Sequence, residues 1–322
     1  MDGFIPQERD PKWSAFNDHS WESFQETYLP NVDLIPTVHE EVKKQYRAIR
    51  KLIAYSYFEY EFFDIAASQM AMLMEMAMVW KYEQVTGEKW KKKTKKKEPK
   101  RDLKNLFNWL IENGYLDKIA PIDTELLRNT RNYYAHPQRH GFAGGSHKMR
   151  ITELIFFINE LYDLNVKTSN VLGEDIVKWL NRNRQLRKVL RIPGHIFPLA
   201  EIALAGIDCS TQIPNYFFVG FPLFDLSQID DQSPYAQKTM MVHQIVDLVV
   251  CDQYMSGKHL PSENEIRIEV ADSDGTLFID QWHHDLSKRS HLAAQLPMWR
   301  IVELQDFFVQ RKTEYYRGFS WR

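Results

Sequence analysis

The sequence predicts a mainly α-helical protein, in which a helical bundle is followed by a smaller α+β C-terminal domain. Residues 38–86 contain neither Gly nor Pro, and apolar or small side chains recur every three or four positions, as in a helix with one buried face. Beyond Pro193, short apolar runs (Ile202–Ile207 and Phe217–Phe221) and segments of alternating polarity (Glu265–Ala271 and Thr276–Trp282) favour strands. We therefore expect an N-terminal arm at 1–37, a helical domain at 38–192 and an accessory domain, regulatory or sensory, at 193–322.

The arm combines prolines with aromatic residues, which predicts an extended segment with short helical pieces that packs through its rings. The segment 38–86 is longer than most helices of globular proteins. We expect a break near Tyr55–Glu61, where polar and aromatic residues are crowded, and an end at Gly87, because glycine favours the left-handed conformation that terminates helices.

Four shorter helices are expected in the rest of the helical domain, at about 103–113, 124–136, 147–165 and 174–191. Asn113-Gly114 should stop the first of them. Pro137 should end the second, because a proline disfavours helix at the residue before it. In the accessory domain, Asp272-Ser-Asp-Gly275 predicts the turn of a hairpin, and a late helix is expected at about 295–312.

Composition and cysteine content narrow the class of protein. Hydrophobic residues make up 44% and charged residues 26% of the chain, as in soluble globular domains. Cys209 and Cys251 are too few for a disulfide framework, which predicts a reducing compartment and thus a cytoplasmic protein. The first residues lack the pattern of a secretory signal. No uninterrupted apolar run approaches the roughly 18 residues of a membrane span, so we expect no membrane partner.

Charge is segregated along the chain. The net charge is −2, yet residues 89–101 carry nine Lys or Arg and one Glu, while residues 221–280 carry eleven Asp or Glu and three Lys or Arg. A basic run of this kind is typical of a site for a polyanion. The residues expected to contact RNA here are Trp90, Lys91, Lys92, Lys93, Lys95, Lys96 and Lys97, with the tryptophan stacking on a base. The alternative is a solvated loop.

The most informative segment is Leu127-Arg-Asn-Thr-Arg-Asn-Tyr-Tyr-Ala-His-Pro137. Among the histidines of the chain, only His136 follows an arginine, Arg131, by five to seven positions. Asn132 and His136 share a helix face. Arg131 and His136 lie about 140° apart on an ideal helix, so they would flank a groove.

Through Arg131, Asn132 and His136 the sequence resembles the HEPN superfamily of nucleotide-binding and RNA-cutting helical domains, whose motif is Arg-x(4–6)-His, often with Asn after the Arg. The motif ends a predicted helix, an earlier helix carries acidic residues, and another helix follows. The resemblance covers roughly residues 39–170. It implies an endoribonuclease that works as a homodimer, with the site at the dimer interface and without a metal or other cofactor. Asp64 or Glu75 would be the acidic partner that orients Arg131.

The chemistry of these side chains suits RNA cleavage. The 2′-hydroxyl of RNA is a built-in nucleophile, and a histidine can remove its proton or protonate the leaving 5′-oxygen. Arg131 would stabilise negative charge on the phosphate in the transition state, and Asn132 would hold the phosphate or fix the imidazole tautomer. Two motifs across a two-fold axis would supply both an acid and a base. Further RNA contacts are expected from Arg128, Arg139 and His140.

Two other classes of function stay open. In one, a non-catalytic module binds RNA or a nucleotide through Arg131 and the lysine run; in the other, a helical scaffold only dimerises. Large members of the superfamily often act as toxins or in antiphage defence, which implies a possible regulatory protein or antitoxin as a partner. The histidines of the C-terminal region do not have the spacing of a zinc site, so we expect no metal.

Overall fold

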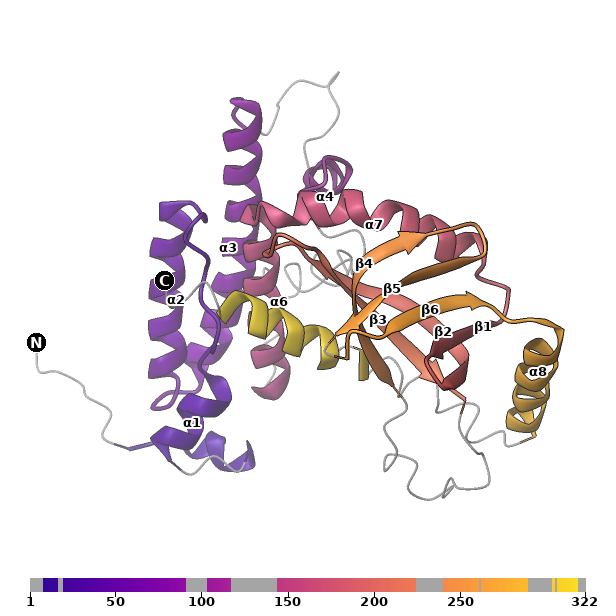
Figure 1. Cartoon of the computed structure of the whole chain (residues 1–322). Helices are drawn as coiled ribbons and strands as arrows, with labels where there is room; N and C mark the ends of the chain where they lie inside the picture. Colours follow the sequence, from indigo (N-terminus) through magenta and orange to yellow (C-terminus); the bar gives the residue numbers. More distant parts are fainter. Residues whose placement is uncertain are drawn as a thin grey trace, which may run out of the picture. The chain divides into compact units, whose positions relative to one another are not determined.

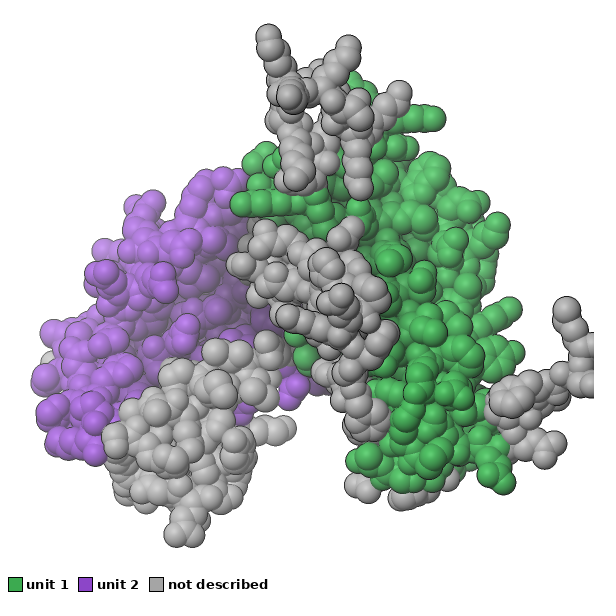
Figure 2. All heavy atoms as spheres, turned by 180° about the vertical axis from the view of Figure 1, so that it is seen from behind, with its two compact units in different colours: residues 1–117, 121–166, 311–322 green, residues 118–120, 167–310 purple. Residues whose placement is uncertain are grey.

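The computed structural model describes residues 8–16, 20–90, 103–116, 144–223, 240–260, 262–288, 303–304 and 306–317. The chain forms two compact units, coloured separately in Figure 2. Unit 1 comprises Met1–Asp117, Pro121–Val166 and Arg311–Arg322, and unit 2 comprises Lys118–Ala120 and Lys167–Gln310. The chain thus passes into unit 2 near residue 167 and returns to unit 1 within a helix that covers residues 306–317.

The described part of unit 1 is helical (Figure 1). Its elements are η1 (Pro11–Phe16), α1 (Trp21–Tyr28), α2 (Glu40–Tyr55), α3 (Glu61–Thr86), α4 (Leu103–Glu112) and α6 (Gly144–Tyr162). The expected break between the two long helices is confirmed, because α2 ends at Tyr55 and α3 begins at Glu61. The expected stop at Gly87 is confirmed as well: this residue caps α3 with φ of 70°.

Helix α3 is the central core helix of unit 1 and packs against α2 and α6. Its buried face is rich in Ala and Met, which allows close approach of neighbouring helices and fills irregular gaps. By length and composition α3 could span a membrane, although it contains no uninterrupted apolar run of that length. The same features are typical of a core helix, and half of its most apolar stretch is buried in this unit.

The arm packs through its aromatic rings, as the sequence predicts. Trp13 and Phe24 are fully buried, and their ring centroids lie 4.8 Å apart in an edge-to-face arrangement. The indole Nε1–H of Trp13 donates a hydrogen bond of 2.7 Å to the carbonyl oxygen of Ser56, in the connection between α2 and α3. The arm is therefore part of the helical core.

Unit 2 contains a closed, six-stranded antiparallel β-barrel (Figure 1). The strands are β1 (Lys188–Ile192), β2 (His195–Asp208), β3 (Asn215–Pro222), β4 (Met241–Val250), β5 (Tyr254–Leu260) and β6 (Glu265–Val270). Each strand pairs with the next, and β1 pairs with β6 to close the barrel. Helices α7 (Asn165–Arg182) and α8 (Ser273–Ser287) flank the strands.

The two faces of the barrel wall bury different apolar sets. Residues of the inner face, such as Leu190, Phe218 and Ile268, form one cluster that α7 completes with Trp179. On the outer face of β2 and β3 a second cluster includes Phe221, with Leu304, Phe307 and Phe308 packed against it. Strand β3 is therefore buried on both sides, which explains why its sequence is almost continuously apolar.

The coarse fold class predicted from the sequence is confirmed: a helical N-terminal region is followed by an α+β region. With a six-stranded barrel the chain as a whole is α+β and not mainly α, and barrel closure was not foreseen. Two local predictions are wrong. The helix expected at 174–191 ends at Arg182, and β1 begins at Lys188. The hairpin expected around Asp272 is the start of α8, because the Asp272 side chain caps that helix.

Candidate functional site

Most of the predicted site lies outside the described residues. This holds for the motif residues Arg131, Asn132 and His136, and for Arg128, Arg139 and His140. It also holds for the predicted phosphate contacts Lys91, Lys92, Lys93, Lys95, Lys96 and Lys97. In the sequence, the motif falls between α4 and α6 of unit 1. The described part of the candidate site consists of Asp64, Glu75 and Trp90.

Asp64 forms a hydrogen-bonded pair with a histidine that the sequence analysis did not single out. His147 lies in the first turns of α6 and is 2% exposed. Its Nε2 lies 2.7 Å from Oδ1 of Asp64, in the first turn of α3. A carboxylate can only accept, so the imidazole Nε2–H is the donor. The ring of Phe63 packs edge-on against the imidazole, with centroids 5.9 Å apart. The pair therefore joins the starts of α3 and α6.

A sequence signal for His147 does exist. It precedes Ile151, Leu154 and Ile158 at spacings of four, three and four residues, and all three are buried. The histidine thus belongs to the apolar face of α6. A buried imidazole needs a hydrogen-bond partner, and the acidic residue at the start of a neighbouring helix supplies it. The spacing identifies the histidine, whereas the partner depends on how the two helices pack.

Glu75 lies on the same face of α3 as Asp64, because eleven residues correspond to about three full turns. The two residues are about 16 Å apart along the helix axis, so they cannot both orient a single guanidinium directly. Glu75 is half-buried. Asp64 is hydrogen-bonded to His147, whereas Glu75 lies about three turns further along α3 and stays a candidate partner of Arg131.

Trp90 is held against the helical core of unit 1. Its ring centroid lies 4.9 Å from that of Tyr82 in an edge-to-face arrangement. Its backbone N–H donates a 2.9 Å hydrogen bond to the carboxylate of Glu83. The indole is half-buried, so one part of it stays accessible. Stacking of Trp90 on an RNA base stays a prediction.

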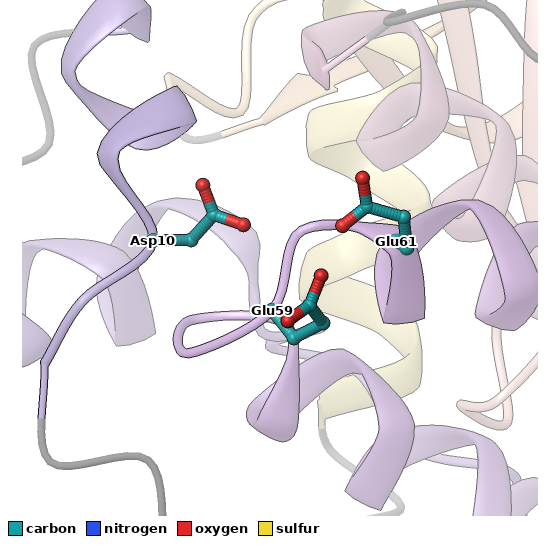
Figure 3. Close-up of side chains that lie close together, drawn as sticks. All are labelled: Asp10, Glu59 and Glu61. Carbon is teal, nitrogen blue, oxygen red and sulfur yellow. The ribbon is translucent and has the colours of Figure 1, made fainter.

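Figure 3 shows three carboxylates, those of Asp10, Glu59 and Glu61, around the connection between α2 and α3. Both oxygens of Asp10 accept backbone N–H groups, from Lys12 at 2.9 Å and Tyr60 at 2.8 Å. Glu61 is paired with the Lys12 ammonium. A hydrogen bond from Glu59, together with this ammonium, lowers the pKa of Glu61 to about 2. These contacts hold the arm against the α2–α3 connection. The three carboxylates therefore have a structural role.

In unit 2, His243 is buried inside the barrel. It lies opposite Phe218 in the β3–β4 ladder and is 4% exposed. Neither ring nitrogen has a hydrogen-bond partner within the described part of the chain. Burial lowers its pKa to about 4, and the nearby imidazole of His259, with ring centroids 5.4 Å apart, acts in the same direction. His243 is therefore neutral at neutral pH.

We compared the chain with models of protein families, with functionally characterised proteins and with solved structures. No family model, curated protein or solved structure matches it.

Proposed function

We propose that this protein is a cytoplasmic, metal-independent endoribonuclease with a HEPN-like helical domain, which acts as a homodimer. The observation that carries the proposal is the spacing of Arg131, Asn132 and His136. Two features of unit 1 support it. In the sequence, the motif falls between helices of the described part of unit 1, and a long helix with acidic residues, α3, precedes it. A role as a toxin or in antiphage defence is part of the proposal through the resemblance alone.

Each motif residue has a defined task in this mechanism. One His136 removes the proton of the 2′-hydroxyl, and the oxygen attacks the adjacent phosphorus. The His136 of the second subunit protonates the leaving 5′-oxygen. The Arg131 guanidinium binds the phosphate oxygens as their negative charge increases, and Asn132 positions the phosphate. The products are a 2′,3′-cyclic phosphate and a 5′-hydroxyl.

The Asp64–His147 pair has a positioning role in this proposal. His147 follows His136 by eleven residues in the sequence and fixes the start of α6 to α3. The pair thus anchors the chain shortly after the motif. Asp64 itself would act on the fold of the bundle and not directly on RNA.

The test is cleavage of RNA by the full-length chain in the presence of EDTA. Wild type should produce fragments that end in a 2′,3′-cyclic phosphate, and Arg131→Ala and His136→Ala should lose at least about a hundredfold in rate. His195→Ala is the matched control, because this histidine lies exposed at the start of β2 in unit 2. Equal rates for wild type and His136→Ala would refute the mechanism.

One observation favours the alternative, a non-catalytic HEPN-like module that binds RNA or a nucleotide, or only dimerises. Asp64, expected to orient Arg131, is hydrogen-bonded to His147. An arginine can bind phosphate whether or not a carboxylate orients it. If the module binds RNA, the RNA remains intact, and Arg131→Ala weakens binding while His136→Ala does not. A module that only dimerises neither binds nor cleaves RNA.

A further inference from the structure

Unit 2 has a pocket of about 370 Å³ between the end of α7 and strand β2. Its walls come from two sides. Val177, Leu180 and the turn after α7 form one side. The other is formed by residues 199–204 of β2. The β2–β3 register shifts between Leu199 and Glu201 and again between Leu204 and Gly206. Such bulges bend a strand locally and are over-represented at the rims of barrels and next to active sites.

Three cationic side chains line this pocket, Arg184, Arg187 and Lys188, against one acidic side chain, Glu201. This balance is the reverse of the net charge of −2 of the whole chain. Arg187 is partly neutralised, because its Nε donates a 2.9 Å hydrogen bond to Asp280 of α8. For Arg184 the described residues provide no ion pair. Among the described residues, Arg184 therefore contributes to the lining an exposed guanidinium without an ion pair.

Lys188 makes the charged wall rigid. Its side chain is buried at the start of β1, and its ammonium donates hydrogen bonds of 2.6 Å to Asn183 and 3.1 Å to Leu186, both to backbone oxygens. These bonds fix the turn that carries Arg184. An ammonium has three donors, and two are used here. Burial lowers the pKa of Lys188, and the carboxylate of Glu201 opposes this shift.

We propose that this pocket binds a small organic phosphate of nucleotide size, with the phosphate held by Arg184 beside Lys188 and the organic part on the apolar floor formed by Leu180, Leu199 and Leu204. The floor residues line the pocket directly. This site lies in unit 2, and the inference does not rest on the proposed nuclease activity.

The size and lining of the pocket argue for an organic phosphate and against a free inorganic anion. A water molecule takes up roughly 30 Å³. Inorganic phosphate is only a few times larger than water, so it would leave most of the pocket empty. Pockets for small molecules begin at roughly 300 Å³ and combine apolar walls with a few polar groups. This pocket has that size, and its polar groups are predominantly cationic.

The experiment is calorimetric titration of the full-length chain with each of the four ribonucleoside 5′-monophosphates. Inorganic phosphate and unphosphorylated adenosine are separate arms. The principal variant is Arg184→Glu, an exposed position at which charge reversal leaves the core intact. Arg182→Glu is the matched control: it lies two residues away, is exposed, and does not line the pocket. Arg131→Ala separates this site from any nucleotide binding by the motif.

At least one nucleotide should bind, and Arg184→Glu should weaken its binding roughly tenfold to a hundredfold, as expected for a lost charged hydrogen bond. Arg182→Glu and Arg131→Ala should bind like wild type. The proposal is overturned if no nucleotide binds at millimolar concentration, if Arg184→Glu and Arg182→Glu bind alike, or if inorganic phosphate or adenosine binds as tightly as the nucleotide. If Arg131→Ala is the only variant that loses nucleotide binding, the nucleotide binds to unit 1, and the proposal is overturned as well.

Discussion

At the scale of single residues, the Asp64–His147 pair is the best-defined part of the candidate site, and its contribution to stability can be measured. Asp64→Ala removes the acceptor of a buried imidazole N–H. We expect the free energy of unfolding of unit 1 to fall by about 1–3 kcal/mol, the usual cost of an unsatisfied buried donor. Urea denaturation followed by circular dichroism measures the change.

Asp64→Asn is the matched variant, since its amide oxygen can still accept the hydrogen bond from His147. It should therefore lose less stability than Asp64→Ala. If both variants unfold at the wild-type urea concentration, the pair contributes nothing to the fold, and its positioning role in the nuclease proposal disappears with it.

His243 predicts a pH dependence of stability for unit 2. Its pKa is about 4 in the folded state, below the value of about 6.5 expected in the unfolded chain. The unfolded state therefore binds more protons between these two values. The stability is fully present above pH 6.5 and is lost as the pH falls toward 4. The total loss is about 3 kcal/mol, because each pKa unit corresponds to about 1.4 kcal/mol.

His243→Phe should abolish this part of the pH dependence, since it replaces the imidazole by an apolar ring opposite Phe218. Thermal unfolding between pH 4 and 7 measures it. His195→Gln is the control, because that histidine is exposed. If the melting temperature of His243→Phe depends on pH as steeply as that of wild type, other groups account for the acid sensitivity.

At the scale of elements, a side-chain N-cap begins helix α8. The side chain of Asp272 accepts a 2.8 Å hydrogen bond from the backbone N–H of Gly275. Asp272→Ala should lower the free energy of unfolding of unit 2 by about 1 kcal/mol, as is typical for loss of an N-cap. Asp285→Ala near the other end of the same helix removes only surface contacts with Gln281 and Lys288, so it should change the free energy of unfolding little. Thermal unfolding of both variants makes the comparison, and equal melting temperatures would contradict the capping role.

The same helix shows where local sequence patterns are ambiguous. Asp-Ser-Asp-Gly fits both a hairpin turn and a helix N-cap. The decision lies in the residues that follow, where Ile279 and Trp282 are buried at a helical spacing of three, while Leu277 and Phe278 are exposed. Polarity alternation alone could not separate these possibilities.

Some of the strands were predictable, but their closure into a barrel was not. The apolar runs Ile202–Ile207 and Phe217–Phe221 lie within β2 and β3, and the alternating segment Glu265–Ala271 contains β6. In contrast, β1 lies in a segment expected to be helical. Closure requires β1 to pair with β6, for example Lys188 with Val270. This contact joins residues far apart in the chain, and no local pattern encodes it. The same limit applies to the candidate site. The spacing of Arg131 and His136 is a local pattern that the sequence displays, whereas the pairing of Asp64 with His147 depends on how two helices pack.

At the scale of the whole molecule, the chain leaves unit 1 and returns to it. Residues 311–322 belong to unit 1, although residues 167–310 before them form unit 2. Tyr316 is 3% exposed, and its ring stacks on that of Phe156 with centroids 6.1 Å apart. Lys312 is paired with Glu160 of α6. A truncation after residue 192 would therefore remove part of the helical core together with the barrel.

Tyr316→Ala tests this arrangement directly. Loss of this buried aromatic side chain should lower the free energy of unfolding of unit 1 by about 3 kcal/mol. If the two units unfold separately, Tyr316→Ala lowers the melting temperature of one transition, and His243→Phe, which lies in the barrel, identifies the other. Arg317→Ala, an exposed neighbour, should leave both transitions unchanged. If Tyr316→Ala shifts the barrel transition instead, or behaves like Arg317→Ala, then the C-terminal residues do not stabilise unit 1. In that case a truncation after residue 192 would become a suitable way to study the helical unit alone.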